Sequence, residues 1–410
     1  MRILHLLPAF EPAWAVGGTT TAHSNLCSEL ASLGHRVTVY TTCCDGLGGQ
    51  LKMPVGQPVK LRDIEVWYFH FELGRRRAFY SRSLLAKLKE TVKTFDLVHL
   101  AGLWQYLCYA ASAVCLESGV PYVITPHSSL MLASFHGVGA TPAKKIYWKL
   151  WGRKVIRNAP AVHFLSQKER GDSSAFCFSS PSFIVPNGIY VDRYERDERL
   201  RAEVRARFNI PDGALVILFL GRVHPKKNLD LVIRALPALR RRRPDVFLMI
   251  VGPVDQMNYV QKLRTLAGQL NLSSCLVWTG LVDHWQTPAF YSAADLIVMP
   301  SLVEGVSLAL TEAMAASLPV IISKNVANCH EIEQDRAGLV IEPSAREVER
   351  ALLKICLDPE LYSALAERAR AAAQKRYDIR LVARLMLRAY QDVLSGERSP
   401  ELSWKQIPDQ

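Results

Sequence analysis

The second half of the chain alternates short apolar runs with segments of helical spacing, and this alternation restricts the fold more than any other feature. Apolar runs that read as buried strands lie at residues 215–220, 246–251, 276–279, 295–299, 320–322 and 339–341. The first half begins in the same way, with a strand at 2–7, a helix at 20–33 and a strand at 36–41. Strands that alternate with helices in this manner predict parallel sheets covered by helices on both faces.

The length of the chain predicts two such domains, because 410 residues exceed one ordinary hydrophobic core. We expect an α/β protein with two Rossmann-like, doubly wound parallel sheets that face a cleft, since ligands bind at the carboxyl ends of the strands in such folds. The expected parts are an N-terminal domain at 1–190, a charged linker at 191–213, a C-terminal domain at 214–376, and a C-terminal helix at 377–398 that packs back on the N-terminal domain.

The charge and the cysteines narrow the classes of partner and compartment. Lys and Arg number 50 against 38 Asp and Glu, and the net charge of +12 favours an anionic partner such as a nucleotide diphosphate, a nucleic acid or an acidic membrane face. The nine cysteines form no Cys-x-x-Cys pair, which argues for a reducing compartment rather than a disulfide framework or a zinc site. The start of the chain reads as a strand and not as a secretory signal, so we expect a cytoplasmic protein.

Residues 97–116 contain no Asp, Glu, Lys or Arg, and a run of this length is on paper able to span a bilayer. His99 and Gln105 within the run, and Gly102 at a suitable turn position, favour a different interpretation. We expect a buried strand at 97–100 followed by a core-facing helix at 103–118.

Two carboxylates eight residues apart, Glu304 and Glu312, bracket a predicted helix start that follows the strand at 295–299. Ser307 is a reasonable N-cap, so Glu304 lies in the loop and Glu312 on the second helical turn. The first N–H groups of such a helix are free to bind a phosphate. The alternative is a surface loop glutamate followed by a solvated helix glutamate, and the spacing alone does not decide between the two.

Three other strand ends carry candidate ligand-binding groups. Arg222 and Lys227 lie in the loop after the strand at 215–220, before a helix that Asn228 is expected to cap, and can close on one diphosphate; a solvated basic turn is the alternative. Gly17 and Gly18 follow the first strand and allow backbone N–H groups to reach a phosphate, although a glycine pair is often a simple turn. His127 follows another strand and can hydrogen-bond a sugar hydroxyl or a phosphate, although a single histidine is more often structural.

Together these features resemble family 4 of the retaining glycosyltransferases, which have the GT-B fold and include enzymes of bacterial surface polysaccharide and exopolysaccharide synthesis. The motifs that carry the resemblance occur in the family's order: Gly221-Arg222-Val223, Lys227-Asn228-Leu229, Val251-Gly252-Pro253, Thr279-Gly280-Leu281-Val282, Glu304 to Glu312, Pro319-Val320-Ile321 and Gly338-Leu339-Val340. The chain departs from the family's pattern at Val306, Ser307, Ser317 and the pair Cys329-His330. These departures leave the donor sugar open.

The resemblance implies a role for each candidate residue. Arg222 and Lys227 would hold the donor diphosphate, Glu304 the hydroxyls of the donor sugar, and Glu312 the ribose. The backbone N–H groups of Ser307 and Leu308 would bind phosphate, Val282 would contact the base, and Gly17, Gly18 and His127 would line the opposite wall. Glu304 and His127 are the catalytic candidates of this set.

The resemblance also implies retention of anomeric configuration without a metal or cofactor, and the sequence contains no Asp-x-Asp motif that would hold Mg²⁺ or Mn²⁺. We therefore expect a metal-independent hexosyltransferase or related enzyme. Its partners would be a UDP-, GDP- or ADP-linked sugar and a glycan or lipid-linked acceptor. Two alternatives remain: a GT-B nucleotide-sugar epimerase, which needs no acceptor, and an inactive nucleotide-binding scaffold. A nucleic-acid partner is not expected, because no base-stacking motif occurs.

A basic aromatic stretch, residues 144–154, predicts a surface that binds membranes. Lys144, Lys145, Trp148, Lys149 and Trp151 suit an amphipathic helix on an anionic membrane, which would make the enzyme peripheral on the inner face of the membrane. A partly buried helix with solvated lysine ends is the alternative.

Overall fold

The structure is a computed structural model that describes residues 1–46, 48–71, 79–132, 141–177 and 180–396. It divides into two compact units. Unit 1 contains Met1–Gly188 and the segment that begins at Ile379, and unit 2 contains Ile189–Asp378. Residues 191–213, which we expected as a linker, therefore lie within unit 2.

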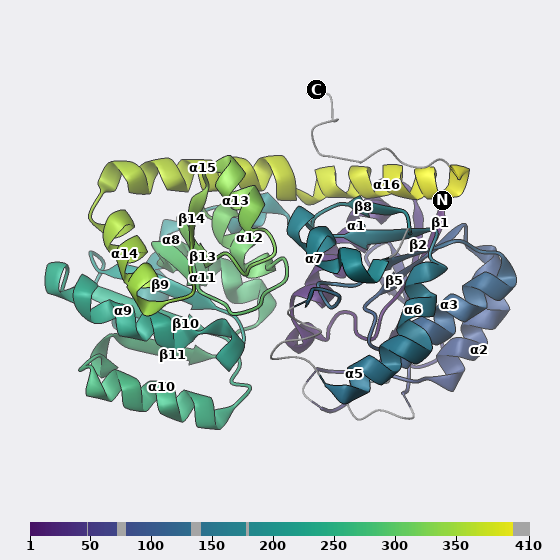
Figure 1. Cartoon of the computed structure of the whole chain (residues 1–410), viewed down its shortest axis with the longest axis horizontal. Helices are drawn as coiled ribbons and strands as arrows, with labels where there is room; N and C mark the ends of the chain where they lie inside the picture. The colour runs from purple at the N-terminus through teal and green to yellow at the C-terminus, as the bar shows by residue number, and fades with distance from the viewer. Residues whose placement is uncertain (47, 72–78, 133–140, 178–179, 397–410) are drawn as a thin grey trace. The chain divides into compact units, whose positions relative to one another are not determined.

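Unit 1 is built on an eight-stranded sheet of order β3-β4-β2-β1-β5-β6-β7-β8. Its strands are β1 (Arg2–Leu6), β2 (Arg36–Thr42), β3 (Pro58–Leu61), β4 (Ile64–Phe69), β5 (Leu97–Ala101), β6 (Tyr122–Thr125), β7 (Ala161–Phe164) and β8 (Ser182–Ile184). Its helical segments are η1 (Trp14–Val16), α1 (Gly18–Ser32), α2 (Arg82–Thr91), η2 (Val92–Thr94), α3 (Tyr106–Ser118), α5 (Pro142–Tyr147), the π-helical η3 (Trp148–Gly152), α6 (Arg153–Arg157), α7 (Gln167–Cys177) and α16 (Ile379–Ser395). The C-terminal α16 packs on α1 (Figure 1).

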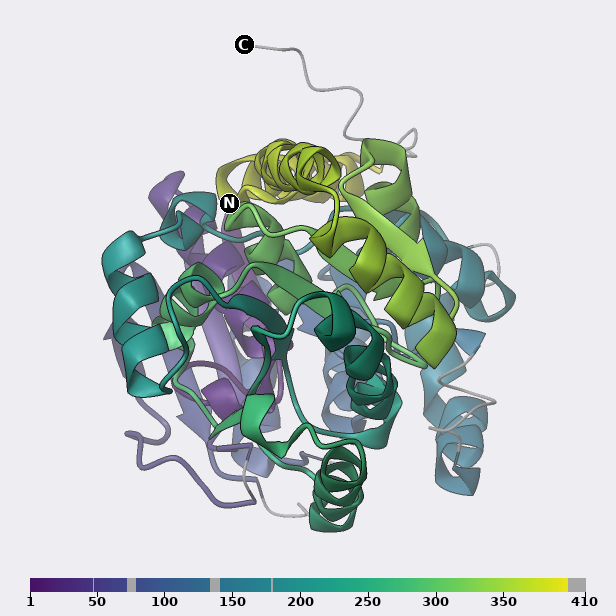
Figure 2. The ribbon, with the colours of Figure 1, turned by 90° about the vertical axis from the view of Figure 1, so that its left-hand side faces the viewer.

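Unit 2 is built on a six-stranded parallel sheet of order β11-β10-β9-β12-β13-β14. Its strands are β9 (Leu215–Leu220), β10 (Val246–Val251), β11 (Leu276–Gly280), β12 (Leu296–Met299), β13 (Val320–Ser323) and β14 (Gly338–Ile341). Its helical segments are η4 (Val191–Tyr194), α8 (Glu198–Arg207), η5 (Pro225–Lys227), α9 (Leu229–Arg242), α10 (Met257–Gln269), η6 (Ser273–Cys275), η7 (His284–Gln286), α11 (Thr287–Ala293), α12 (Leu308–Ala315), α13 (Cys329–Asp335), α14 (Ala345–Cys356) and α15 (Pro359–Tyr377). Figure 2, in which unit 2 faces the viewer, shows helices on both sides of this sheet.

The two sheets confirm the predicted doubly wound α/β class, with one departure. In unit 1 the short edge strand β3 pairs antiparallel with β4, so that sheet is mixed rather than wholly parallel. The prediction missed β3 because its four residues alternate between half-buried and exposed positions and form no apolar run. The uncharged run at 97–116 folds as the buried strand β5 and the helix α3, as predicted. Among the described residues, no helix is both long and apolar enough to cross a membrane.

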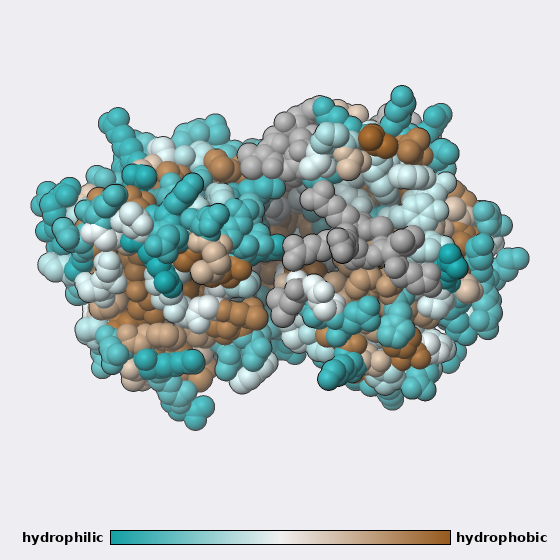
Figure 3. Space-filling model, turned by 90° about the horizontal axis from the view of Figure 1, so that it is seen from below, coloured by the Kyte–Doolittle hydropathy of each residue, from teal (hydrophilic) through white to brown (hydrophobic). Residues whose placement is uncertain are grey.

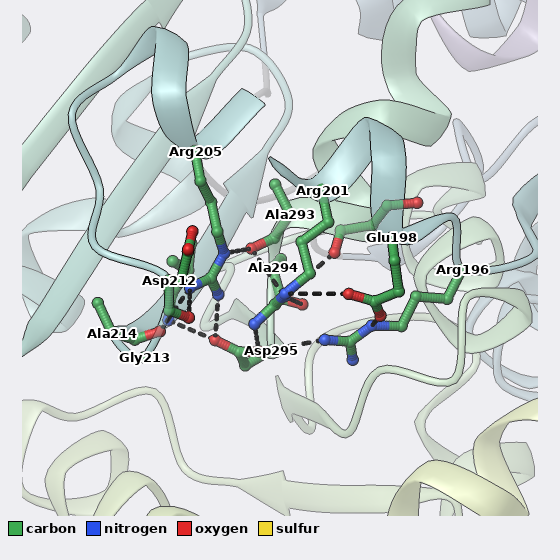
Figure 4. Close-up of polar contacts among 12 residues, drawn as sticks. Arg196, Glu198, Arg201, Arg205, Asp212, Gly213, Ala214, Ala293, Ala294 and Asp295 are labelled. Carbon is green, nitrogen blue, oxygen red and sulfur yellow. Dashed lines mark hydrogen bonds and ion pairs between the residues drawn. The ribbon is translucent and has the colours of Figure 1, made fainter. Parts of the chain in front are cut away.

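A buried ionic network joins α8 to the start of β12 within unit 2 (Figure 4). Asp295, which precedes β12, forms ion pairs with Arg201 at 3.0 Å and with Arg205 at 2.9 Å, and it also accepts the backbone N–H of Val216 at 2.7 Å. The Arg205 side chain is 1% exposed and donates to four backbone carbonyls besides. Since these guanidinium groups come from the segment expected as a linker, the network explains why that segment belongs to unit 2.

A directional chain of hydrogen bonds joins α16 to the sheet of unit 1. It runs from Tyr390 to His99 (2.6 Å), from His99 to Thr125 (2.6 Å), from Thr125 to His163 (2.7 Å), and from His163 to the carbonyl oxygen of Val185 (2.7 Å). Because a carbonyl oxygen only accepts, Nε2 of His163 is the donor to Val185 and its Nδ1 accepts from Thr125. Thr125 then accepts from Nε2 of His99, and the Tyr390 hydroxyl donates to Nδ1. Burial lowers the pKa of His99 and His163, so both rings are neutral and each is held in one tautomer.

Candidate functional site

The sheet of unit 2 has the strand order 3-2-1-4-5-6 of a doubly wound nucleotide-binding domain. Its order reverses between β9 and β12, and ligands in such sheets bind at the carboxyl ends of the strands on either side of that point. The loop after β9 contains Arg222 and Lys227, and the loop after β12 contains Glu304. Three of the predicted site residues thus lie at the switch point.

Lys227 and Glu304 form the closest contact in this region. The Lys227 Nζ lies 2.5 Å from a carboxylate oxygen of Glu304, and the two side chains are 17% and 19% exposed. The Lys227 ammonium also lies over Gly221, where a Cβ atom would be 3.7 Å from Nζ. The half-buried pair offers a bound molecule both hydrogen-bond donors, from the Lys227 ammonium, and acceptors, from the Glu304 carboxylate.

Backbone contacts hold the two loops together. The side-chain amide of Asn228 donates to the carbonyl oxygen of Pro300 at 3.0 Å, and the N–H of Leu302 donates to the carbonyl oxygen of Lys226 at 2.8 Å. Asn228 is the N-cap residue of α9, as predicted, but its backbone is left-handed and its side chain makes no capping hydrogen bond. Its amide instead joins the loop that carries Lys227 to the loop that carries Glu304.

Two glycines permit the close approach of the loops after β9 and β10. A Cβ atom on Gly252 would lie 2.1 Å from the carbonyl oxygen of Gly221, which is too close for any side chain. Both residues also have positive φ, 144° for Gly221 and 138° for Gly252. Glycine is therefore required at Gly252 by space as well as by backbone conformation, and it is favoured at Gly221 by backbone conformation.

The helix α12 begins after the Glu304 loop with its first N–H groups uncapped by a side chain. Ser307 is the N-cap residue, as predicted, but its hydroxyl makes no capping hydrogen bond. Glu312 lies on the second turn and is buried, with its Oε2 accepting the Tyr291 hydroxyl at 2.7 Å. Burial, with the Glu312 charge as a second cause, raises the pKa of Tyr291. Tyr291 thus fixes one carboxylate oxygen of Glu312, and Tyr194 is a second hydroxyl that hydrogen-bonds this carboxylate.

The remaining predicted residues of unit 2 are more exposed. The side chain of Arg222 is exposed and forms no hydrogen bond or ion pair with the residues that the structure describes. Val282 is half-buried in the loop after β11. Arg222 and Lys227 share one loop, but only Lys227 contacts Glu304.

The predicted residues of unit 1 lie in loops at the carboxyl ends of its strands. Gly17 (φ 108°) and Gly18 end the loop after β1 and start α1. His127 follows β6, and its Nε2 lies 2.9 Å from Nε2 of His23 on α1. Burial, and then the neighbouring His23, lower the pKa of His127 well below its ordinary range. Both rings are therefore neutral at physiological pH, and one donates to the other.

Two partners of the candidate residues, Tyr291 and His23, were missed from the sequence, and so was Glu169, which accepts the backbone N–H of Ser128 beside His127. Tyr291 and His23 gave no signal, because each meets its partner only through tertiary packing. Glu169 did have a signal, since Ser166-x-x-Glu169 before α7 has the spacing of a capping box. Among the described residues, no group of three or more His, Cys, Asp or Glu side chains is arranged to hold a metal ion.

Family models match most of the chain. A model described as "Glycosyltransferase Family 4" matches residues 16–193, and one described as "Glycosyl transferases group 1" matches residues 201–372. The chain belongs to glycosyltransferase family 4. As a member of this family, the protein is a glycosyltransferase that uses a nucleotide sugar.

Relatives and solved structures agree with this assignment. The chain is 30% identical to a GDP-mannose-dependent alpha-(1-6)-phosphatidylinositol monomannoside mannosyltransferase of Mycobacterium tuberculosis over 270 residues. The matched region covers 61% of this chain and 67% of that protein. Its fold is similar to that of sucrose-phosphate synthase from Thermosynechococcus elongatus, with a TM-score of 0.75 at 19% identity over 97% and 100% of the two chains. It is also similar to Anabaena HepE in complex with UDP and glucose, with a TM-score of 0.73 at 18% identity over 95% and 99% of the chains. These likenesses show the GT-B fold.

Proposed function

We propose that this family 4 enzyme is a retaining, metal-independent hexosyltransferase that moves a sugar from a nucleoside diphosphate to a glycan or lipid-linked acceptor. The observation that carries the proposal is the contact between Lys227 and Glu304 at the switch point of unit 2, beside the uncapped start of α12. The pair offers a cation for the diphosphate and a carboxylate for the sugar hydroxyls.

In the proposed reaction, the bond between the anomeric carbon of the donor sugar and the β-phosphate oxygen breaks, and the acceptor oxygen bonds to that carbon on the same face. The acceptor's proton passes to a phosphate oxygen of the leaving nucleoside diphosphate. Arg222, Lys227 and the N–H groups of Ser307 and Leu308 neutralise the charge that develops on that diphosphate. Lys227 has three donor hydrogens, so it can bind a phosphate oxygen while it keeps its contact with Glu304.

The remaining candidates complete the donor and acceptor sites. Glu312, whose carboxylate Tyr291 and Tyr194 hold in place, binds the ribose, and Val282 contacts the base. His127 of unit 1 contacts the reacting sugar or a phosphate oxygen, and Gly17 and Gly18 offer backbone N–H groups. The names of the relatives point to the classes of ligand: one is GDP-mannose-dependent and acts on a phosphatidylinositol mannoside, and one structure contains UDP with glucose. We propose a role in the synthesis of a surface polysaccharide or glycolipid.

We also propose that unit 1 docks on anionic lipid through α5 and η3, although not through the tryptophans that the sequence suggested. Trp148 packs against Phe176 with ring centroids 5.4 Å apart, and Trp151 packs against Tyr106 at 5.8 Å, so neither tryptophan is free to enter a membrane. The exposed apolar side chains are instead Ile146 (58%) and Leu150 (47%). Exposed Lys145 and Lys149 flank them. On the face that Figure 3 shows, hydrophilic and hydrophobic residues are interspersed over this unit.

The first step of the test is a screen of UDP-, GDP- and ADP-sugars for the donor that raises the melting temperature of the purified protein most. That donor is then used in a transfer assay. Glu304→Gln should nearly abolish transfer, and Lys227→Ala should lower kcat/KM by about 10² to 10³, as removal of one oxyanion donor does. The matched control is Glu90→Gln, because the pair Lys87–Glu90 on α2 of unit 1 has the same chemistry at 3.3 Å and lies on none of the loops of the proposed donor site. Full activity of Glu304→Gln would overturn the assignment of the site.

Three further readouts separate the alternatives. Transfer should survive excess EDTA, and activity that stops with EDTA and returns with Mn²⁺ would contradict metal independence. NMR of the product should show that the anomeric configuration of the donor is retained. Release of free nucleotide should depend on the acceptor; release without any acceptor, with an epimerised sugar, would favour an epimerase.

A further inference from the structure

The loop after β6 has an unusual backbone conformation. His127 (φ 51°) and Ser128 (φ 60°) are consecutive residues in the left-handed region, and neither is glycine. Such residues are strained, and they keep this conformation only where surrounding contacts fix them. The contacts that hold this loop therefore decide where the His127 ring lies.

Glu169 makes the contact that fixes the loop. It is the third residue of α7, and its side chain is fully buried. One carboxylate oxygen accepts the backbone N–H of Ser128, and the other accepts the backbone N–H of Leu165 at 2.8 Å. The backbone N–H of Glu169 in turn donates to the Ser166 hydroxyl at 3.1 Å, so the first turn of α7 is itself capped.

Within the described part of the chain, the charge of Glu169 has no counter-ion. Among the residues that the structure describes, none forms an ion pair with this carboxylate. A buried carboxylate without a cation is costly, and glutamine would fill the same volume without that cost. Glutamine, however, has one acceptor oxygen, and its NH₂ group would face the second N–H donor. Only a carboxylate satisfies both the Ser128 and the Leu165 donors.

We propose that Glu169 is a positioning residue for sugar transfer, because it accepts the Ser128 N–H and so holds the left-handed loop that presents His127. This inference rests on the proposed function, in which His127 contacts the reacting sugar or phosphate. The ring of His127 is constrained separately by its hydrogen bond of 2.9 Å to His23. Glu169 thus fixes the backbone of the loop, and His23 fixes the orientation of the imidazole.

The ionisation of Glu169 should make this positioning role visible in the pH dependence of turnover. Burial raises its pKa to about 7, and the groups that oppose this shift are the Leu165 and Ser128 donors; no charged side chain is among the causes. When the carboxyl group takes up a proton, one oxygen becomes a hydroxyl and accepts the second N–H more weakly than a carboxylate oxygen does. The loop is then held less firmly, so turnover should fall as the pH falls through about 7.

The decisive variant is Glu169→Gln, assayed for kcat and for KM of the donor across pH 5.5 to 8.5. We expect kcat to fall by about 10- to 100-fold, as a small misplacement of a reacting group does, with an unchanged donor KM. The acidic limb of the kcat profile near pH 7 should also disappear. The matched control is Glu347→Gln on α14, since the Glu347 N–H donates to Ser344 in the same capping arrangement at 3.2 Å, and its kcat and pH profile should equal those of the parent.

Three outcomes separate this inference from the proposed function. If Glu169→Gln keeps the parental kcat and pH profile while His127→Gln is inactive, the positioning role is wrong. If His127→Gln is fully active, or the parent transfers no sugar, the proposed function fails instead. If Glu169→Gln does not fold, hydrogen exchange of residues 122–132 in the unmodified protein decides the question: exchange should be faster at pH 6 than at pH 8 after correction for intrinsic rates, and equal corrected protection would overturn the inference.

Discussion

Four buried histidines should make the stability of unit 1 strongly dependent on pH. His5, His23, His99 and His163 are each at most 3% exposed. Burial lowers the pKa of His5 to about 3 and that of His163 to about 4, and it also lowers the pKa of His23 and His99 well below the ordinary range. In the unfolded chain, these rings take up protons near pH 6.5. Between about pH 6.5 and 4 the unfolded state therefore binds more protons, and stability is lost as the pH falls.

The size of the effect follows from the width of this interval. Each histidine that stays neutral in the folded state costs about 1.4 kcal/mol of unfolding free energy for each pH unit below 6.5. At pH 5 this is about 2 kcal/mol for a single ring, and about 4 kcal/mol for His5 and His163 together. Because a typical domain is stable by about 5–15 kcal/mol in total, unit 1 should lose a large part of its stability at pH 5.

The variant that isolates the effect is His5→Leu, because neither ring nitrogen of His5 has a hydrogen-bond partner among the described residues. The unfolding free energies of parent and variant should be measured in urea at pH 7.5 and at pH 5.0, with hydrogen exchange of β1 and β5 as the reporter of unit 1. The difference between the two unfolding free energies should change by about 2 kcal/mol from the higher pH to the lower. The variant should be the more stable protein at pH 5. The exposed His330→Gln should leave the pH dependence unchanged. Parallel pH profiles of the parent and His5→Leu would refute the reasoning.

Three further predictions concern other parts of the chain. Arg205→Ala should lower the unfolding free energy of unit 2 by about 3–5 kcal/mol in urea titrations, because it leaves Asp295 buried with one cation fewer; a loss below about 1 kcal/mol would contradict a buried network. Ser317→Gly should raise stability by about 1 kcal/mol in thermal unfolding, since Ser317 has a left-handed φ of 59° after α12. The double variant Ile146→Ser, Leu150→Ser should bind anionic vesicles less in cosedimentation while it keeps activity on a soluble acceptor, and undiminished binding would rule out this surface.

The strands of unit 2 could be predicted closely from the sequence because each is an apolar run bounded by polar turns. The runs at 215–220 and 246–251 coincide with β9 and β10, and the run at 320–322 lies within β13. The switch point then places Lys227 and Glu304 in neighbouring loops, since β9 and β12 are adjacent strands. That step needed only the strand order of a doubly wound sheet.

The supporting contacts of the site could not be predicted in the same way. The hydrogen bonds of Glu312 with Tyr291 and of His127 with His23 join residues that are 21 and 104 positions apart. No periodic pattern relates such pairs, because they depend on how a helix packs on its sheet. The Glu169 capping box was visible as a local motif, but its carboxylate reaches the loop after β6, and only the tertiary structure shows that target.

The basic aromatic stretch shows why a helical pattern does not reveal which of two apolar faces is buried. Both faces of residues 144–154 carry apolar side chains, Trp148 and Trp151 on one and Ile146 and Leu150 on the other. Aromatic rings bury more area than aliphatic side chains and gain further from ring contacts, so the tryptophans pack against Tyr106, Tyr109 and Phe176. The aliphatic pair is left exposed beside the lysines. The proposed lipid binding would therefore depend on Ile146 and Leu150, whereas replacement of either tryptophan would destabilise unit 1 and would not test the proposed membrane surface.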